Sequence, residues 1–316
     1  MVRIAFAGDT MLGRGVAERL EEDPKAALVA PEVLAVAAEA DMTILNLECC
    51  ISERGERWPD PAKPFFFRAP PAAVDTLSAL GARCVTLANN HALDYGTVAL
   101  VDTFAHLEAA GIAWVGAGLD LTAARAPALL DVAGERIAVV GFTDHPAEYA
   151  ARADRPGVAH AELHAGVPGW LTSLVGAGPP PVIVLVHWGP NMTARPEPYV
   201  RAAAATLEQA GATLVAGHSA HVFHGLAGRV LYDLGDFVDD YWTDPLLRND
   251  LGLLWLVTLD ADGPRRLEAV PLTLEYCHTR LAVGDDARWV RSRLHAACRE
   301  LGTDVVDDQD RLVFDW

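Results

Sequence analysis

Short apolar runs alternate with longer stretches of mixed polarity along this chain. Ten runs of six to ten residues are bounded by glycine, proline or polar residues, a pattern that predicts buried β-strands. They lie at residues 2–8, 42–47, 82–88, 112–117, 136–142, 181–188, 212–217, 229–235, 252–260 and 265–274.

Alanine- and leucine-rich segments between the earlier runs predict helices at 26–40, 71–80, 97–110 and 198–210. This alternation predicts an α/β protein with largely parallel central strands. No helix separates the last two runs, so we expect them to form a second, antiparallel or mixed sheet. Residues 284–301 predict a late amphipathic helix, which an acidic tail follows.

Three loops stand out by their length and their proline and glycine content, at 52–64, 143–157 and 189–200. Loops of this length in a compact domain usually carry function. A strand-like run resumes directly after each loop, so none of them is an interdomain linker. We therefore expect one domain over residues 1–316, with residues 276–316 forming a C-terminal helix and tail that pack on it.

The net charge of −18 disfavours nucleic acids and anionic membranes as partners, although a bound cation can reverse the field locally for a small anion. The five cysteines show no Cys-x-x-Cys spacing, which argues against a disulfide framework and a thiolate zinc site. We expect Cys84, in an apolar run, to be a buried free thiol.

The N-terminal apolar stretch is too short for a signal peptide, and no segment reaches the roughly 18 apolar residues of a membrane span. We therefore expect a soluble cytoplasmic protein without membrane insertion. The sequence leaves the oligomeric state open.

Polar side chains follow six of the predicted strands directly. They are Asp9, Asn46 with Glu48, Asn89 to His91, His187, His218 and Asp236. Each has an ordinary alternative, such as a turn, a helix cap or a buried core histidine. Six in succession are harder to explain that way, because ligands in α/β sheets collect beyond the carboxyl ends of strands.

The types of side chain at these strand ends indicate what they bind. Carboxylates, an amide oxygen and imidazoles, without thiolates, suit Mn²⁺, Fe²⁺ or Zn²⁺ at a reactive site rather than a structural zinc. Two such ions bridged by a carboxylate would activate water and polarise a phosphoryl or acyl centre.

The ordered motifs resemble those of the CapA family of poly-γ-glutamate (capsule) synthesis proteins, a branch of the calcineurin-like metallophosphoesterases. They are "GDTMLGR", "NLE", "ANNHALDYG", "HWGPN", "GHSAHVFHG" and "YDLGDFVDDY", and they span about residues 1–260. The resemblance implies a four-layer αββα sandwich, with two mixed sheets flanked by helices and a metal centre at the strand ends.

The resemblance also implies roles for individual residues. The metal ligands would be Asp9, Glu48, Asn90, His187, His218 and His221, and they would hold one or two divalent ions, Mn²⁺ first and Fe²⁺ or Zn²⁺ otherwise. His91 would act on the leaving group.

Three departures from the superfamily pattern concern the first metal position. Met11 stands where an imidazole is expected, Ser219 and Ala220 separate the last two histidines, and Glu48 replaces an aspartate. The sequence therefore leaves open whether one or two ions are held.

For catalysis we expect Asp94 to hydrogen-bond His91 and fix its tautomer. Asp236 is expected to contact substrate or support the ligands, with a helix cap as the alternative. Arg14, Arg195 and Arg248 are candidates to bind an anionic substrate, against the commoner outcome of solvated arginines.

The expected function is a metal-dependent hydrolase that acts on a small phosphoester or γ-glutamyl-type substrate. One alternative is metal-dependent amide-bond chemistry in the biosynthesis of poly-γ-glutamate or a related compound. Another is a non-catalytic assembly subunit of a polymer synthase.

Overall fold

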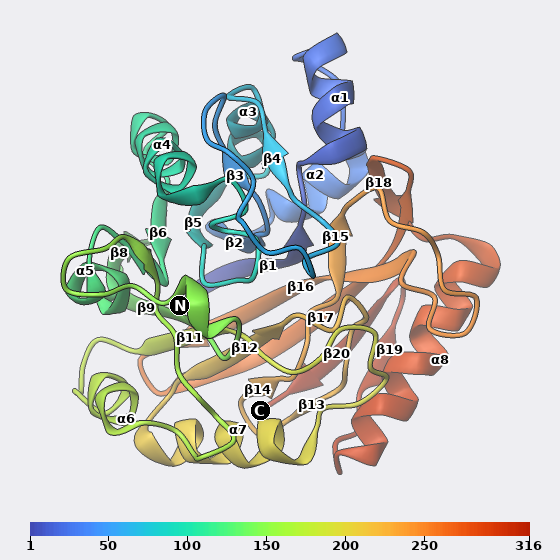
Figure 1. Cartoon of the computed structure of the whole chain (residues 1–316). Helices are drawn as coiled ribbons and strands as arrows, with labels where there is room; N and C mark the ends of the chain where they lie inside the picture. The colour runs from blue at the N-terminus through green and yellow to red at the C-terminus, as the bar shows by residue number, and fades with distance from the viewer.

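Two β-sheets lie face to face, and helices cover the outer face of each (Figure 1). The computed structural model describes all residues from Met1 to Trp316. The first sheet has ten strands, and its main path runs in the order β19-β20-β17-β16-β1-β2-β5-β6. Their bounds are β1 Val2–Thr10, β2 Met42–Leu47, β5 Ala82–Thr86, β6 Ala113–Val115, β16 Leu251–Asp260, β17 Gly263–Glu275, β19 Val306–Asp308 and β20 Arg311–Asp315, while β15 (Asp236–Val238) pairs with β1 and β18 (His278–Leu281) with β17.

The second sheet has six strands in the order β13-β14-β12-β11-β9-β8. Their bounds are β8 Ala128–Val132, β9 Glu135–Thr143, β11 Val182–His187, β12 Leu214–His218, β13 Leu226–Ala227 and β14 Val230–Leu231. Strands β9, β11, β12 and β14 are parallel, as are β1, β2, β5 and β6 in the first sheet. Two short pairs complete the strands, β3 (Cys50–Ile51) with β4 (Arg68–Ala69), and β7 (Ala117–Gly118) with β10 (Gly157–Val158).

Three apolar layers hold these elements together. The middle layer lies between the sheets and joins Ile4 and Phe6 of β1 to Val139 of β9 and Leu185 of β11. An outer layer packs the first sheet against α1 (Arg14–Glu22), α2 (Pro31–Ala37), α3 (Ala73–Ala79) and α4 (Gly96–Ala109). The third packs the second sheet against α5 (Leu121–Arg125), α6 (Gly169–Val175) and α7 (Pro198–Ala210). The predicted four-layer αββα sandwich is confirmed.

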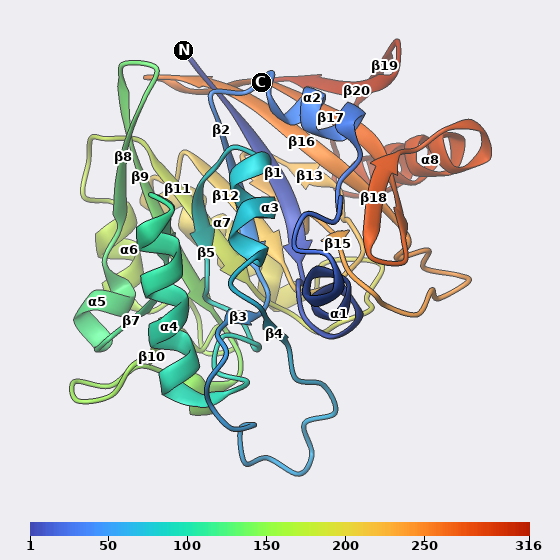
Figure 2. The same cartoon turned by 90° about the horizontal axis from the view of Figure 1, so that it is seen from above.

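The C-terminal region packs on the antiparallel side of the first sheet. Helix α8 (Gly284–Glu300) buries Val290, Leu294 and Cys298 in the middle layer, and it contacts β16, β17 and β13 (Figure 2). The tail that follows forms β19 and β20, which extend the first sheet beside β17.

The structure corrects two expectations about strands. The runs at 252–260 and 265–274 do not form a second sheet: β16 pairs antiparallel with β1, and β17 continues the first sheet. The pattern of apolar and polar residues predicts that a segment is a strand but not which strand it pairs with. The pairing of β16 and β17 could therefore not be predicted from the sequence. In the run 229–235 only Val230–Leu231 is a strand, because Gly235 takes a φ of +77° and turns the chain into β15.

All five cysteines are free and buried, as expected for Cys84. No helix is long and apolar enough to cross a bilayer.

Candidate metal centre

Polar residues at or just beyond the carboxyl ends of β1, β2, β5, β11 and β12 meet Asp236, the first residue of β15. Two glycine–aspartate pairs bring β1 and β15 together, because Gly8-Asp9 runs beside Gly235-Asp236 in parallel register. The Asp9 N–H donates to Gly235 O at 2.8 Å, and a Cβ on Gly8 would lie only 1.7 Å from that oxygen. Any side chain at position 8 would push the two aspartates apart.

Asp9 is the hub of the cluster. Its Oδ1 accepts hydrogen bonds from Asn46 Nδ2 and His218 Nδ1, each at 2.9 Å. Its Oδ2 accepts from the Ser219 N–H at 3.2 Å and lies 3.5 Å from His221 Nδ1. The buried carboxylate is therefore fixed from both sheets.

The other predicted ligands lie around Asp9. His187 Nε2 is 3.3 Å from Glu48 Oε1, and both side chains are fully buried. One ligand atom from each of Asp9, Glu48 and His221 lies within 4.8 Å of the others. Asn90 follows β5, whose neighbour β2 leads to Glu48.

Several buried polar atoms in this cluster have no hydrogen-bond partner. They are Glu48 Oε2, Asn90 Oδ1, His187 Nδ1, His218 Nε2, Asp236 Oδ2, Asp239 Oδ2 and the Tyr241 hydroxyl. A buried polar atom without a partner costs about 1–3 kcal/mol, so such atoms are few in native proteins. Carboxylate, amide and imidazole atoms left free in one place fit a divalent cation, which would satisfy them together.

The pKa values of the acids in the cluster also favour a bound cation. Burial, and then the negative charge of Asp9, raises the pKa of Glu48 well above its usual range. Burial and the nearby Asp239 raise the pKa of Asp236 in the same way, and burial raises the pKa of Asp239 to about 6. For Asp9, burial is outweighed by the hydrogen bond and charge of His218, so its pKa is lowered. A cation would relieve the repulsion among these acids.

His91 and Asp94 form the predicted pair. His91 Nδ1 lies 2.6 Å from Asp94 Oδ2, and the ring stacks on Phe67 with centroids 3.9 Å apart. Burial outweighs the pull of Asp94 and lowers the pKa of His91 to about 4. The imidazole is therefore neutral at pH 7, with Nδ1–H donating to the carboxylate and Nε2 left as an acceptor.

Asp94 is held firmly by groups that the sequence did not indicate. It accepts from the Phe67 N–H at 2.6 Å and from the Tyr149 hydroxyl at 3.1 Å, and it pairs with Lys63 Nζ at 3.0 Å. Lys63 also donates to Asn90 O at 2.8 Å. One lysine thus ties the carboxylate to the backbone of a predicted metal ligand.

A pocket of about 550 Å³ opens beside this pair. It is lined by Trp58, Lys63, Asn90, His145 and Tyr149, among others. Most of these residues come from two of the long loops, 52–64 and 143–157, and the first of them extends away from the sheets between β3 and β4 (Figure 2). Loop length points to these two segments in the sequence, but it does not select the residues within them.

His145 is a histidine near the centre that the sequence did not indicate. Its Nδ1 is bonded to Asp144, whose other oxygen accepts from the Gly189 N–H at 3.1 Å and the Tyr199 hydroxyl at 3.0 Å. The His145 ring lies 4.9 Å from that of His187, centroid to centroid. It therefore links the pocket to the metal cluster.

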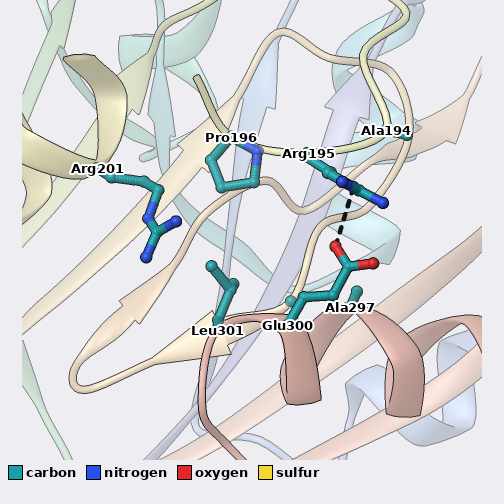
Figure 3. A pocket seen from close by; sticks show the side chains of 8 residues that line it. Ala194, Arg195, Pro196, Arg201, Ala297, Glu300 and Leu301 are labelled. Atoms are coloured by element: carbon teal, nitrogen blue, oxygen red, sulfur yellow. Dashed lines mark ion pairs between the residues drawn. The ribbon is translucent and has the colours of Figure 1, made fainter. Parts of the chain in front are cut away.

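All three predicted arginines pair with acidic side chains, and only Arg14 lies beside the cluster, where it covers Phe67 and Tyr241. Arg195 pairs with Glu300 at 3.0 Å and lines a different pocket, with Pro196, Arg201 and Leu301 (Figure 3). Arg248 pairs with Asp250 and Asp286. Arg14 pairs with Asp240 and lies over the rings of Phe65, Phe67 and Tyr241. Of the predicted substrate contacts only Asp236 lies in the cluster, where its Oδ1 is 2.8 Å from His221 Nδ1.

The fold and the site define a class: an αββα sandwich protein with a carboxylate, amide and imidazole cluster at its strand ends. Residues 3–241 match the family of bacterial capsule synthesis proteins (PGA_cap), and the chain belongs to that family. The resemblance to CapA proteins drawn from the motifs is confirmed.

Two relatives show the extent of the similarity. A protein of Mycobacterium tuberculosis named "Probable polyglutamine synthesis accessory protein" is 34% identical over an alignment that covers 99% of this chain and 95% of the relative. The "PGA biosynthesis protein CapA" of Bacillus subtilis is 29% identical, with 85% of this chain and 71% of the relative covered. Among solved structures, the NAD nucleotidase NadN of Haemophilus influenzae is 12% identical with a TM-score of 0.43, over 98% of this chain and 57% of that one. A likeness that low bears on neither substrate nor chemistry.

Manganese is expected to stabilise the protein more at pH 7.5 than at pH 5.5. Protons compete with the cation for its ligands, and the pKa of Glu48, a predicted ligand, is raised well above its usual range, so lowering the pH weakens binding. At 100 times its Kd, Mn²⁺ would stabilise the fold by about 2.7 kcal/mol, or roughly 4 °C in Tm for a chain of this length. Thermal melts with MnCl₂ and with chelator, at both pH values, measure the difference. Equal shifts at both pH values would contradict carboxylate binding.

Proposed function

We propose that this protein is a metal-dependent hydrolase that acts on a small phosphoester or a γ-glutamyl-type substrate. The observation that carries the proposal is the set of unpartnered, buried ligand atoms beside the His91–Asp94 pair. A non-catalytic role does not account for these atoms, because each of them destabilises the fold unless something binds it.

The proposed centre uses the ligand types that the cluster presents. Asp9, Glu48 and His221 would hold one ion; Asn90, His187 and His218, whose unpartnered atoms are Oδ1, Nδ1 and Nε2, would hold a second beside it. When bound, such a cation supplies Lewis-acid polarisation of the substrate and lowers the pKa of water. Mn²⁺ is the first candidate for this mixed set of oxygen and nitrogen donors, with Fe²⁺ and Zn²⁺ as alternatives.

The protein's own groups would position the reaction. Neutral His91 would accept at Nε2 the proton that the attacking water releases and pass it to the leaving group, while Asp94 holds the Nδ1–H tautomer. Lys63 and His145 line the pocket and would contact the polar part of a small anionic substrate. A cytoplasmic location is part of this proposal, and cell fractionation tests it.

A non-catalytic role has one observation in its favour, since the M. tuberculosis relative is named an accessory protein. Amide-bond formation would use the same centre in the reverse direction. A non-catalytic subunit predicts no metal-dependent turnover on any substrate. Amide-bond formation predicts that two groups are joined rather than separated.

The test is to assay purified protein on phosphodiester, phosphomonoester and γ-glutamyl substrates, with and without Mn²⁺. Hydrolysis that requires Mn²⁺ is expected, and Asn90→Ala should reduce it by more than about 100-fold through loss of a ligand. Arg195→Ala is the matched control, because its side chain pairs with Glu300 in a separate pocket, and it should retain activity. No metal-dependent turnover on any substrate would leave the accessory role.

A further inference from the structure

Asp236 lies beside Asp9 at the proposed metal centre. Strand β15 runs parallel to β1, and the register sets Asp236 directly opposite Asp9. Asn46 occupies the corresponding position on the other side of Asp9. Met11, by contrast, offers nothing to this centre, because its side chain is buried in the outer apolar layer and its sulfur accepts from the Gly13 N–H.

A single nitrogen of His221 faces both carboxylates. Its Nδ1 is 2.8 Å from Asp236 Oδ1 and 3.5 Å from Asp9 Oδ2. A carboxylate that merely orients a metal-binding histidine bonds the ring nitrogen that points away from the metal. Here Asp236 bonds the nitrogen that points toward Asp9. Neighbouring ligand atoms about 2.1 Å from one ion are separated by about 3–3.5 Å. The distance from His221 Nδ1 to Asp9 Oδ2 lies in that range, and the distance to Asp236 Oδ1 is slightly shorter.

The remaining oxygen atoms distinguish Asp236 from its acidic neighbours. Asp236 is 1% exposed, and its Oδ2 has no partner. Asp233 accepts hydrogen bonds from the backbone N–H groups of Ala220 and Gly235, one on each carboxylate oxygen. Neither oxygen is therefore left without a partner. Asp240 is bonded to Arg14 and the Gly15 N–H. Glu48 adds a second unpartnered carboxylate oxygen to the same cluster.

We propose that Asp236 is a direct ligand of the ion held by Asp9, Glu48 and His221. This inference rests on the proposed metal-dependent function and adds to it a first metal position of three carboxylates and one imidazole. Carboxylate oxygens favour Mn²⁺, whereas imidazoles favour Zn²⁺ and other later metals. Asp236 thus shifts the preference of this position toward Mn²⁺, and it supplies the donor that Met11 does not.

The experiment titrates metal-free protein with Mn²⁺ and follows the free ion by its electron paramagnetic resonance signal, which needs no substrate. Wild-type protein is compared with Asp236→Asn, which keeps the size and a hydrogen bond to His221 but removes the charge. We expect Asp236→Asn to bind one Mn²⁺ fewer, or to bind that ion more than about 100-fold more weakly, since loss of an orienting partner alone costs about 10- to 100-fold. Asp236→His should bind the ion again with its preference moved from Mn²⁺ toward Zn²⁺.

Asp240→Asn is the control, because it removes the same charge from a neighbouring carboxylate that has no free oxygen; it should bind as many ions as wild type. Circular dichroism of each metal-free variant confirms that it is folded. A loss of 100-fold or less in Asp236→Asn, or no change in metal preference in Asp236→His, overturns this inference and leaves the hydrolase proposal standing. Wild-type protein that binds no Mn²⁺ overturns both.

Discussion

Glu48→Gln is expected to abolish metal-dependent activity and to make the metal-free protein more stable at neutral pH. Glu48 is fully buried, its Oε1 lies 3.3 Å from His187 Nε2, and its Oε2 has no partner. Glutamine keeps the shape but removes the charge, so the ion proposed at Asp9, Glu48 and His221 loses one of its carboxylate ligands. Turnover should fall by more than about 100-fold, because loss of an outer partner alone costs about 10- to 100-fold.

The gain in stability follows from the sign of the pKa shift. Burial and Asp9 raise the folded-state pKa of Glu48 well above its ordinary 4.5. Below pH 4.5 the residue is protonated in both the folded and unfolded states and carries no penalty. As the pH rises from 4.5 through the raised pKa, the unfolded state ionises first and the metal-free fold loses stability. Glutamine does not ionise, so the variant avoids that loss.

Denaturant unfolding in chelator at pH 4.5 and pH 8 measures both free energies of unfolding. The variant should exceed wild type at pH 8 and approach it at pH 4.5. With Mn²⁺ at pH 8 the order should reverse, because only wild type gains from binding. A variant that is less stable than wild type in chelator at pH 8 would show that Glu48 serves the fold rather than a cation.

The second large effect is expected from His91→Gln, which should lower kcat by about 10²- to 10⁴-fold, the usual contribution of positioned acid–base groups. Its neutral ring, fixed by Asp94 at 2.6 Å, presents Nε2 to the reacting group, and glutamine cannot exchange a proton there. Mn²⁺ stoichiometry should stay at the wild-type value, because His91 is bonded to Asp94 and stacked on Phe67 and is not one of the proposed ligands.

Steady-state kinetics and metal analysis on the same preparation separate these effects. A fall in kcat with KM nearly unchanged and metal retained assigns His91 to the chemical step. A parallel loss of metal would instead make it a ligand. An unchanged kcat would remove His91 from the mechanism. Asn90→Ala, which should lose metal, gives the contrasting pattern on the neighbouring residue.

The sequence by itself determined the layers and the chemistry at the strand ends. Apolar runs of strand length located β1, β2, β9 and β11 to within two residues, because burial on both faces leaves an uninterrupted apolar signal. The polar residues at the ends of the predicted strands, taken together with the resemblance to CapA proteins, predicted Asp9, Glu48, Asn90, His187, His218 and His221 as ligands, because a polar residue that ends an apolar run can be recognised in the sequence. The pairing of His91 with Asp94 was also accessible, because three residues in one loop separate them.

Only the tertiary structure decided which strands are neighbours and which side chains surround the centre. Strand β16 joins β1 rather than a second sheet, and apolar pattern cannot distinguish the two edges. Lys63, Tyr149 and His145 reach the site from loops whose paths depend on long-range contacts. Arg195 and Arg248 looked free in the sequence but found Glu300, Asp250 and Asp286, because ion pairs form between distant residues. Side-chain type is local information, whereas proximity is a property of the folded chain.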